Sequence, residues 1–162
     1  MKQSNKQIIL FHINGEIRNV EIRPADTLLY ILRKELARTG PKPGCLNGDC
    51  GACTVLIDHT PMKSCIMLAI ETVGHKITTI EGLTDTPIQK AFVENFAFQC
   101  GYCTPGFIMN CHGLVLNHKN PSEETIKEWL SSNICRCTSY HEIELAVHSV
   151  LNNQPSSDGE NK

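Results

Sequence analysis

Cysteine is the residue type in this chain whose number and spacing could support chemistry. Nine of the 162 residues are cysteines, and eight of them fall into two groups of four. The first group is Cys45, Cys50, Cys53 and Cys65, and the second is Cys100, Cys103, Cys135 and Cys137. Clustered thiols bind metals in a reducing compartment and form disulfides in an oxidising one. Two groups of four thiols are therefore candidates for two metal centres.

The chain lacks the usual signs of a secreted disulfide protein. Its cysteine count is odd, and the apolar run at residues 8–11 is too short for the core of a signal peptide. No apolar stretch approaches the roughly 18 residues of a membrane span. The net charge is −2 with no long basic run, so we expect neither nucleic acid nor a membrane as a partner. We expect a cytoplasmic protein whose thiols are metal ligands.

The first cysteine group has the spacing of a ferredoxin loop. Residues 44–54 read GCLNGDCGACT, and together with Cys65 they give C-x4-C-x2-C-x11-C. The first three cysteines match the loop of plant-type [2Fe–2S] proteins, and Cys65 is the only unused candidate nearby for the fourth ligand. Gly44, Gly48 and Gly51 would let the backbone bend tightly and bring N–H groups near the sulfurs. Structural zinc is the alternative, but zinc sites more often use paired C-x2-C units.

The second cysteine group is less specific. Residues 99–106 read QCGYCTPG and residues 133–138 read NICRCT, which supplies one C-x2-C turn and one C-x-C turn. On spacing alone an all-cysteine zinc site remains open beside an iron–sulfur site. The C-x-C pair weighs against zinc, because one-residue spacing strains a tetrahedral chelate. The ninth cysteine, Cys111, lies on the apolar face of a predicted helix and is expected to be a buried core residue.

The first half of the chain is predicted to form strands around one helix. Residues 7–13 and 17–22 are strand-like, and Asn14-Gly15 between them is a strong signal for a type I′ hairpin turn. Thr27 can cap the predicted helix. The remaining predicted elements are a helix over 28–37, a loop over 40–53, strands over 54–57 and 76–80, and a short helix over 65–71.

The second half is predicted to be helical. The apolar spacing favours helices over 87–98, 105–117, 123–132 and 140–151. Pro87 suits a first helical position, and residues 120–123 resemble a helix start with a capping box. These patterns predict an α+β protein with one domain over 1–80, a linker over 81–86, a helical domain over 87–151 and a disordered tail over 152–162.

The two motifs, in this order and with these neighbours, resemble the iron–sulfur subunit or domain of the molybdenum hydroxylases. That family includes xanthine dehydrogenase, aldehyde oxidoreductase, nicotinate dehydrogenase and the aerobic type of carbon monoxide dehydrogenase. The resemblance rests on residues 44–54, 99–106 and 133–140 and covers residues ~7 to 151. It implies a ferredoxin-like β-grasp domain followed by a four-helix bundle, each holding a [2Fe–2S] cluster. This chain departs from the usual family pattern at three places. It has Ser139 where Gly is usual, Ile134 where Leu is usual, and Asp58-His59 where an Asp-Gly turn is usual.

The resemblance also implies a role. The chain would relay electrons from a molybdopterin centre on a large subunit to its second cluster, then to its first, and on to FAD on another subunit or to another acceptor. In this family the residues that match Gln99 and Cys137 approach the pterin. No phosphate-binding or nucleophile motif occurs, so no catalytic residue and no substrate turnover by the chain alone are expected. The substrate of the complex could be xanthine, another N-heterocycle, an aldehyde or carbon monoxide.

Two other functions remain as alternatives. A stand-alone two-cluster ferredoxin would shuttle electrons between enzymes, but a mobile carrier needs only the first domain. A zinc-stabilised interaction module would use the same thiols without redox chemistry. The helical half argues against the first alternative, and the ferredoxin-type loop argues against the second.

Overall fold

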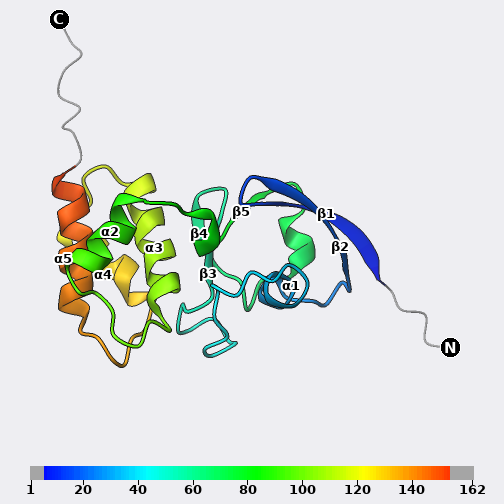
Figure 1. Cartoon of the computed structure of the whole chain (residues 1–162), viewed down its shortest axis with the longest axis horizontal. Helices are drawn as coiled ribbons and strands as arrows, with labels where there is room; N and C mark the ends of the chain where they lie inside the picture. The colour runs from blue at the N-terminus through cyan, green and yellow to red at the C-terminus, as the bar shows by residue number, and fades with distance from the viewer. Residues whose placement is uncertain (1–5, 154–162) are drawn as a thin grey trace, which may run out of the picture.

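The described part of the chain divides into a sheet half and a helical half. The structure, a computed structural model, describes residues 6–153. A mixed β-sheet with the short helix α1 (Leu28–Lys34) lies at one end of the molecule, and the longer helices lie at the other (Figure 1). The predicted α+β class is confirmed. Most of the predicted tail, residues 154–162, lies outside the described residues.

The N-terminal hairpin forms as its sequence predicts. Strands β1 (Gln7–Ile13) and β2 (Glu16–Ile22) pair antiparallel. Asn14 and Gly15 between them have φ values of 50° and 81°, both positive, as a type I′ turn requires. Phe11 and Ile13 face the core with Val20 and Ile22 of the partner strand, because alternate residues of a strand point to the same side.

Three further strands complete a five-stranded sheet of order β2-β1-β5-β3-β4. They are β3 (Thr54–Ile57), β4 (Thr60–Lys63) and β5 (Lys76–Thr78), and β5 runs parallel to β1 while the other pairs are antiparallel. The strand β4 was not predicted. It is short and contains Pro61. It follows a two-residue turn, Asp58-His59, in which both residues have positive φ, although His59 stands where the family pattern usually has glycine.

Several predicted boundaries were wrong. The expected helix over 65–71 is only a short 3-10 helix, η1 (Ala69–Thr72). The helix predicted over 28–37 ends at Lys34, and Ala37 has a positive φ of 53°. The strand predicted over 76–80 ends at Thr78, and the next residues enter the 3-10 helix η2 (Ile80–Gly82). Such ends depend on tertiary contacts more than on local preference.

Four helices of the second half enclose a separate apolar core. They are α2 (Pro87–Glu94), α3 (Thr104–Asn117), α4 (Glu123–Ser131) and α5 (Tyr140–Asn152). Their starts agree with prediction to within a residue, but α2 ends four residues early because Phe96 takes a positive φ of 53°. Thr86 with Gln89 and Ser122 with Thr125 provide the N-terminal caps. None of the described helices is both long and apolar enough to cross a membrane.

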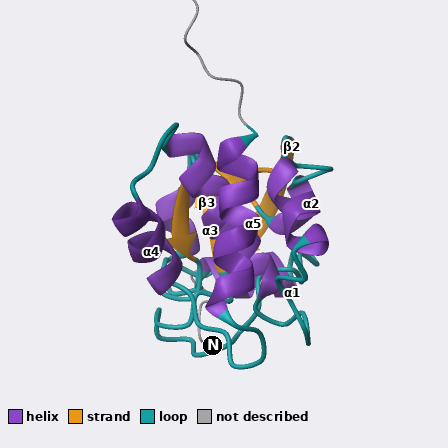
Figure 2. Cartoon of the chain, turned by 90° about the vertical axis from the view of Figure 1, so that its left-hand side faces the viewer, coloured by secondary structure: helices purple, strands orange, loops and turns teal. Residues whose placement is uncertain are grey.

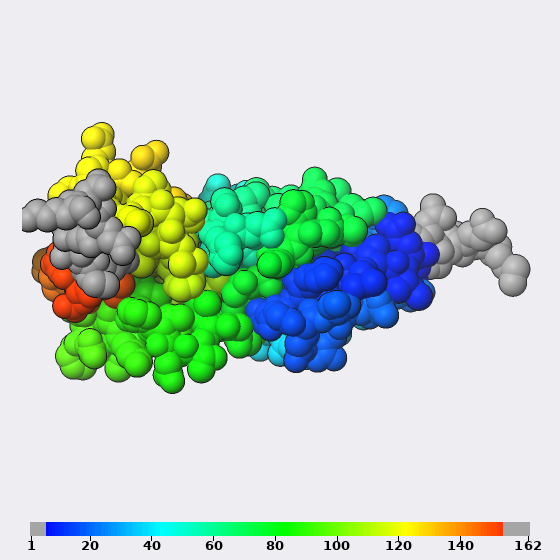
Figure 3. All heavy atoms as spheres, turned by 90° about the horizontal axis from the view of Figure 1, so that it is seen from above, coloured from blue at the N-terminus to red at the C-terminus, as the bar shows by residue number. Residues whose placement is uncertain are grey.

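The helix α3 connects the two halves. Figure 2 shows α3 and α5 in the middle of the helical half, with α4 and α2 on either side and β3 behind. One side of α3 contributes Phe107, Cys111 and Leu114 to the helical core, and the helix also packs on β3 and β4 of the sheet. In Figure 3 the helical half and the sheet half abut along the long axis of the molecule.

Two glycines of α3 allow this close approach. A side-chain carbon at Gly106 would overlap the backbone oxygen of Gly51, and one at Gly113 would overlap the ring of Pro61. Only hydrogen fits between helix and loop at Gly106, because the obstacle there is backbone and not a movable side chain. The distance between the two halves is thus set by these contacts.

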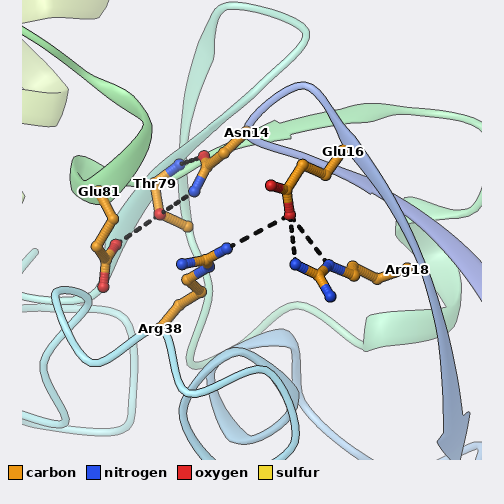
Figure 4. Close-up of polar contacts among 6 residues, drawn as sticks. All are labelled: Asn14, Glu16, Arg18, Arg38, Thr79 and Glu81. Atoms are coloured by element: carbon orange, nitrogen blue, oxygen red, sulfur yellow. Dashed lines mark hydrogen bonds and ion pairs between the residues drawn. The ribbon is translucent and has the colours of Figure 1, made fainter.

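A polar network ties the start of the predicted linker to the sheet half (Figure 4). The side-chain amide of Asn14 makes two hydrogen bonds with Thr79. Its Oδ1 accepts from the Thr79 N–H at 2.9 Å, and its Nδ2 donates to the Thr79 Oγ1 at 3.0 Å. The Thr79 hydroxyl donates to Glu81 at 2.6 Å, and the other Glu81 carboxylate oxygen accepts from the Gly40 N–H at 2.7 Å. The connection between the halves is therefore anchored at Glu81 to the loop that leads into the first cysteine group.

Replacing Gly106 with alanine tests the close approach. Alanine in a helix is favoured over glycine by about 1 kcal/mol, so a purely local effect would stabilise the protein. Overlap with Gly51 should outweigh this gain at a cost of about 1–3 kcal/mol, and the melting temperature in a thermal unfolding assay should fall. Leu116→Ala, at an exposed position of the same helix, is the control and should shift it little. A higher melting temperature for Gly106→Ala would contradict the packing described.

Candidate metal centres

The first cysteine loop directs backbone N–H groups at two of its sulfurs. The N–H of Cys45 donates to Sγ of Cys50, and the N–H of Cys50 donates to Sγ of Cys45, both at 3.3 Å. Backbone hydrogen bonds from Cys50 and Asn47 lower the pKa of Cys45 to about 6. The loop thus brings donors to the sulfurs as predicted, and it favours the thiolate that a metal ligand requires.

Two glycines shape this loop. A side-chain carbon at Gly44 would lie 2.5 Å from Sγ of Cys50, closer than two such atoms approach. Gly51 has a positive φ of 68°, and a side chain there would overlap Asn133 of the helical half. The loop can therefore close around its sulfurs only with glycine at these positions.

The other two cysteines of the first group lie beneath α1. Cys53 and Cys65 are only 2% and 6% exposed and pack with Leu29. Burial, together with a hydrogen bond to Cys53, raises the pKa of Cys65 to about 12. Cys65 follows β4, so the unpredicted strand is the element that returns the chain to the loop.

The second group assembles from two separate turns of the helical half. Cys103 immediately precedes α3, and burial with a hydrogen bond to Cys135 raises its pKa to about 12. Cys100 and Cys137, both exposed, interact so that the pKa of Cys100 is lowered and that of Cys137 is raised. Ser139 takes an ordinary extended conformation as the N-cap of α5, so the turn needs no glycine there.

The thiols of both groups approach in pairs. The pairs are Cys45 with Cys50, Cys53 with Cys65, Cys100 with Cys137, and Cys103 with Cys135. Among residues 6–153, no three His, Cys, Asp or Glu side chains converge in a way that suits a single metal ion. Pairs of thiols fit a [2Fe–2S] cluster, which has two irons and four cysteine ligands.

The two cysteine loops touch each other. The N–H of Ile134 donates to the backbone oxygen of Cys50 at 3.0 Å. The side-chain amide of Asn133, which is 1% exposed, donates to the backbone oxygen of Gly51 at 3.0 Å. Sequence reasoning missed the role of Asn133, because its position two residues before Cys135 gave no sign that it reaches a loop some 80 residues away.

Lys63 is a second residue that the sequence did not single out. It ends β4, is partly buried, and donates a hydrogen bond to the backbone oxygen of Ser132. A side chain at Gly51 would lie 2.8 Å from its Nζ. The lysine ammonium group therefore lies where the two loops meet.

The remaining predicted site residues occupy simpler positions. Gln99 and Cys137 are exposed on the side of the second group, where their predicted approach to a pterin stays a prediction. Cys111 is fully buried in the helical core, as expected, and burial raises its pKa to about 12.

A sheet half and a helical half, each with four thiols in pairs, define the class of protein as a two-centre iron–sulfur protein. Residues 11–72 match the family described as "2Fe-2S iron-sulfur cluster binding domain", and residues 79–148 match the "[2Fe-2S] binding domain". These matches support a [2Fe–2S] cluster in each half, including the second group, where spacing alone left zinc open.

Several known proteins similar to this chain are small subunits of oxidoreductases. The nicotinate dehydrogenase small FeS subunit of Eubacterium barkeri is 40% identical over 91% of this chain and 96% of its own length. The nicotine 6-hydroxylase small subunit of Paenarthrobacter nicotinovorans is 42% identical over 89% of this chain and 89% of its own length. The crystal structure of quinoline 2-oxidoreductase from Pseudomonas putida 86 matches with a TM-score of 0.83 and 36% identity, over 93% of this chain and 99% of that one. The chain belongs to the family of [2Fe–2S] small subunits of the molybdenum hydroxylases.

Replacing Asn133 with alanine tests the contact between the loops. The change removes a buried hydrogen bond and leaves a small cavity, so the free energy of unfolding should fall by about 1–3 kcal/mol. Asn117→Ala is the matched control. The Asn117 amide also bridges the two halves, by donating to the His59 backbone oxygen at 3.1 Å, but this residue is exposed. Denaturant unfolding of both variants should show the larger loss for Asn133→Ala. Equal losses would mean that the buried contact adds no more stability than the exposed one, and would contradict its role.

Proposed function

We propose that this chain is the electron-transfer subunit of a multi-subunit molybdenum hydroxylase and that its eight grouped cysteines hold two [2Fe–2S] clusters. Cys45, Cys50, Cys53 and Cys65 would hold the first, and Cys100, Cys103, Cys135 and Cys137 the second. The observation that carries the proposal is the hydrogen bond from the Ile134 N–H to the Cys50 oxygen, which joins the two ligand loops directly.

The chain's own residues supply a short connection between the two sites. Each bound cluster would take up and release one electron. From Cys50, the route runs through its own backbone to the carbonyl oxygen, across one hydrogen bond to Ile134, and along one peptide to Cys135. Gly51 and Asn133, which are both buried, support this route from the side through the hydrogen bond between them.

Backbone N–H groups at both sites favour the anionic sulfurs of such clusters. Those of Cys45 and Cys50 point at sulfurs in the first loop, and the Thr138 N–H donates to Sγ of Cys135 at 3.3 Å in the second. Hydrogen bonds to sulfur are one of the means by which a protein sets a cluster's potential. The two loops are thus built as ligand cradles and not only as folding elements.

Exposed apolar side chains near the second group support a partner on that side. Phe96, Phe98, Tyr102 and Ile134 are between 39% and 79% exposed, and clusters of exposed aromatic residues commonly mark protein interfaces. We place the large molybdopterin-binding subunit there, near Gln99 and Cys137. The first loop, where Leu46 and Ile66 are each 60% exposed, is where we place an FAD-binding subunit.

The finer features of the resemblance belong to the same proposal. They are a β-grasp domain over 1–80, a four-helix bundle over 87–151 and a cytoplasmic complex in which this chain alone turns over no substrate. The relatives named for nicotinate, nicotine and quinoline favour an N-heterocyclic substrate for the partner's molybdenum centre.

Counting metals in the purified complex tests the proposal. Two clusters require about four irons and four acid-labile sulfides per chain, and reduction should produce two distinct electron paramagnetic resonance (EPR) signals. Copurification with larger subunits would separate this function from a stand-alone ferredoxin, which should purify as an active monomer. One cluster together with one zinc per chain would rule out the two-cluster assignment.

A pair of serine variants tests the ligand assignment. Cys50→Ser should remove or weaken the first EPR signal and leave the second, because the helical half has its own core. Cys137→Ser should do the reverse, and it should block electron flow from the molybdenum subunit. Cys111→Ser, a change in a cysteine outside both groups, is the control and should keep both signals. If both signals persist unchanged in Cys50→Ser or Cys137→Ser, the assignment is wrong.

A further inference from the structure

Lys63 is a positive charge between two sites that would each hold a negative cofactor. Its Nζ donates to the backbone oxygen of Ser132, three residues before Cys135. On its other side lies the backbone of Gly51, next to Cys50. A flexible surface lysine would not keep contacts with two separate loops, so these contacts fix the position of the charge.

The charges around Lys63 are those of the first cysteine group. Lys63 lies two residues before Cys65, and its Nζ lies against the backbone of Gly51, which is next to Cys50. Among the described residues, the ion pairs found do not include one between Lys63 and a carboxylate. Glu128 lines the same cleft of about 350 Å³ between β4 and the helices α3 and α4, but it is exposed. The ammonium charge is therefore left to act on the thiolates.

We propose that Lys63 tunes the relay by raising the reduction potential of the first cluster relative to the second. This inference rests on the proposed function, since it requires a cluster on Cys45, Cys50, Cys53 and Cys65. Reduction adds one electron to that cluster, with no bond made or broken, and a fixed positive charge nearby stabilises the added negative charge. An electron that arrives from the second cluster is then favoured to move on to the first.

The size of the effect follows from Coulomb's law. At an effective dielectric constant of about 20, one unit charge within roughly 12 Å changes an equilibrium by about tenfold, which for a one-electron couple corresponds to about 59 mV. The second cluster should shift less, because Lys63 reaches that side only through a backbone oxygen of Ser132. The signature of the proposal is thus an unequal shift of two potentials.

The experiment is an EPR-monitored redox titration of the assembled complex carrying Lys63→Met. The first cluster should become about tenfold harder to reduce, and the second should change by less. Lys63→Arg keeps the charge and should stay close to the native potential. Lys76→Met, at an exposed position on β5 of the same half, removes the same net charge and is the control. Native potentials in Lys63→Met, or equal shifts in Lys76→Met, would overturn the proposal.

Two further outcomes remain decisive. If Lys63→Met fails to hold the first cluster, Lys63→Gln and Lys63→Arg are compared. Retention by arginine alone supports the role of the charge, whereas loss in all three variants shows a packing role and overturns the proposal. Failure of the proposed function is seen separately, because the unaltered complex would then lack two [2Fe–2S] signals before any variant is compared.

Discussion

Two hydrogen bonds from residues 133 and 134 to the first cysteine loop hold the two halves in the arrangement on which the rest of the structure depends. Both end on backbone oxygens, those of Cys50 and Gly51. The Gly51 oxygen also accepts from the N–H and the hydroxyl of Thr54. A buried donor without a partner is costly, so it is the Asn133 amide, which is 1% exposed, that needs this contact. The contact that would let an electron pass is therefore also a contact that stabilises the fold.

The junction needs small residues as well as hydrogen bonds. Gly106 at the start of α3 leaves room for the backbone of Gly51, and Gly51 in turn leaves room for Asn133. The same absence of side chains lets Lys63 bring its ammonium group against both loops. Steric space, hydrogen bonding and charge thus meet at one point, between the two sets of cysteines.

Much of the fold could be predicted because its signals are local. Asn14-Gly15 specifies its turn through backbone conformation, and Pro87 and Ser122 mark helix starts through the chemistry of their own side chains. The errors lie where local signals are weak. The strand β4 has four residues and a proline, and it exists because β3 offers a partner strand. The end of α2 moved because Phe96 adopts a left-handed conformation that its side chain does not favour.

The sequence by itself determined the two groups of cysteines, the ferredoxin-type spacing of the first group and the division into a sheet half and a helical half, because spacing and periodicity are properties of neighbouring residues. Only the tertiary structure decided how the thiols pair, which loop lies against which, and that Asn133 and Lys63 belong to the site. Those residues act across separations of 69 to 82 positions, and a contact over that distance in the chain arises from the packing of α3 on the sheet.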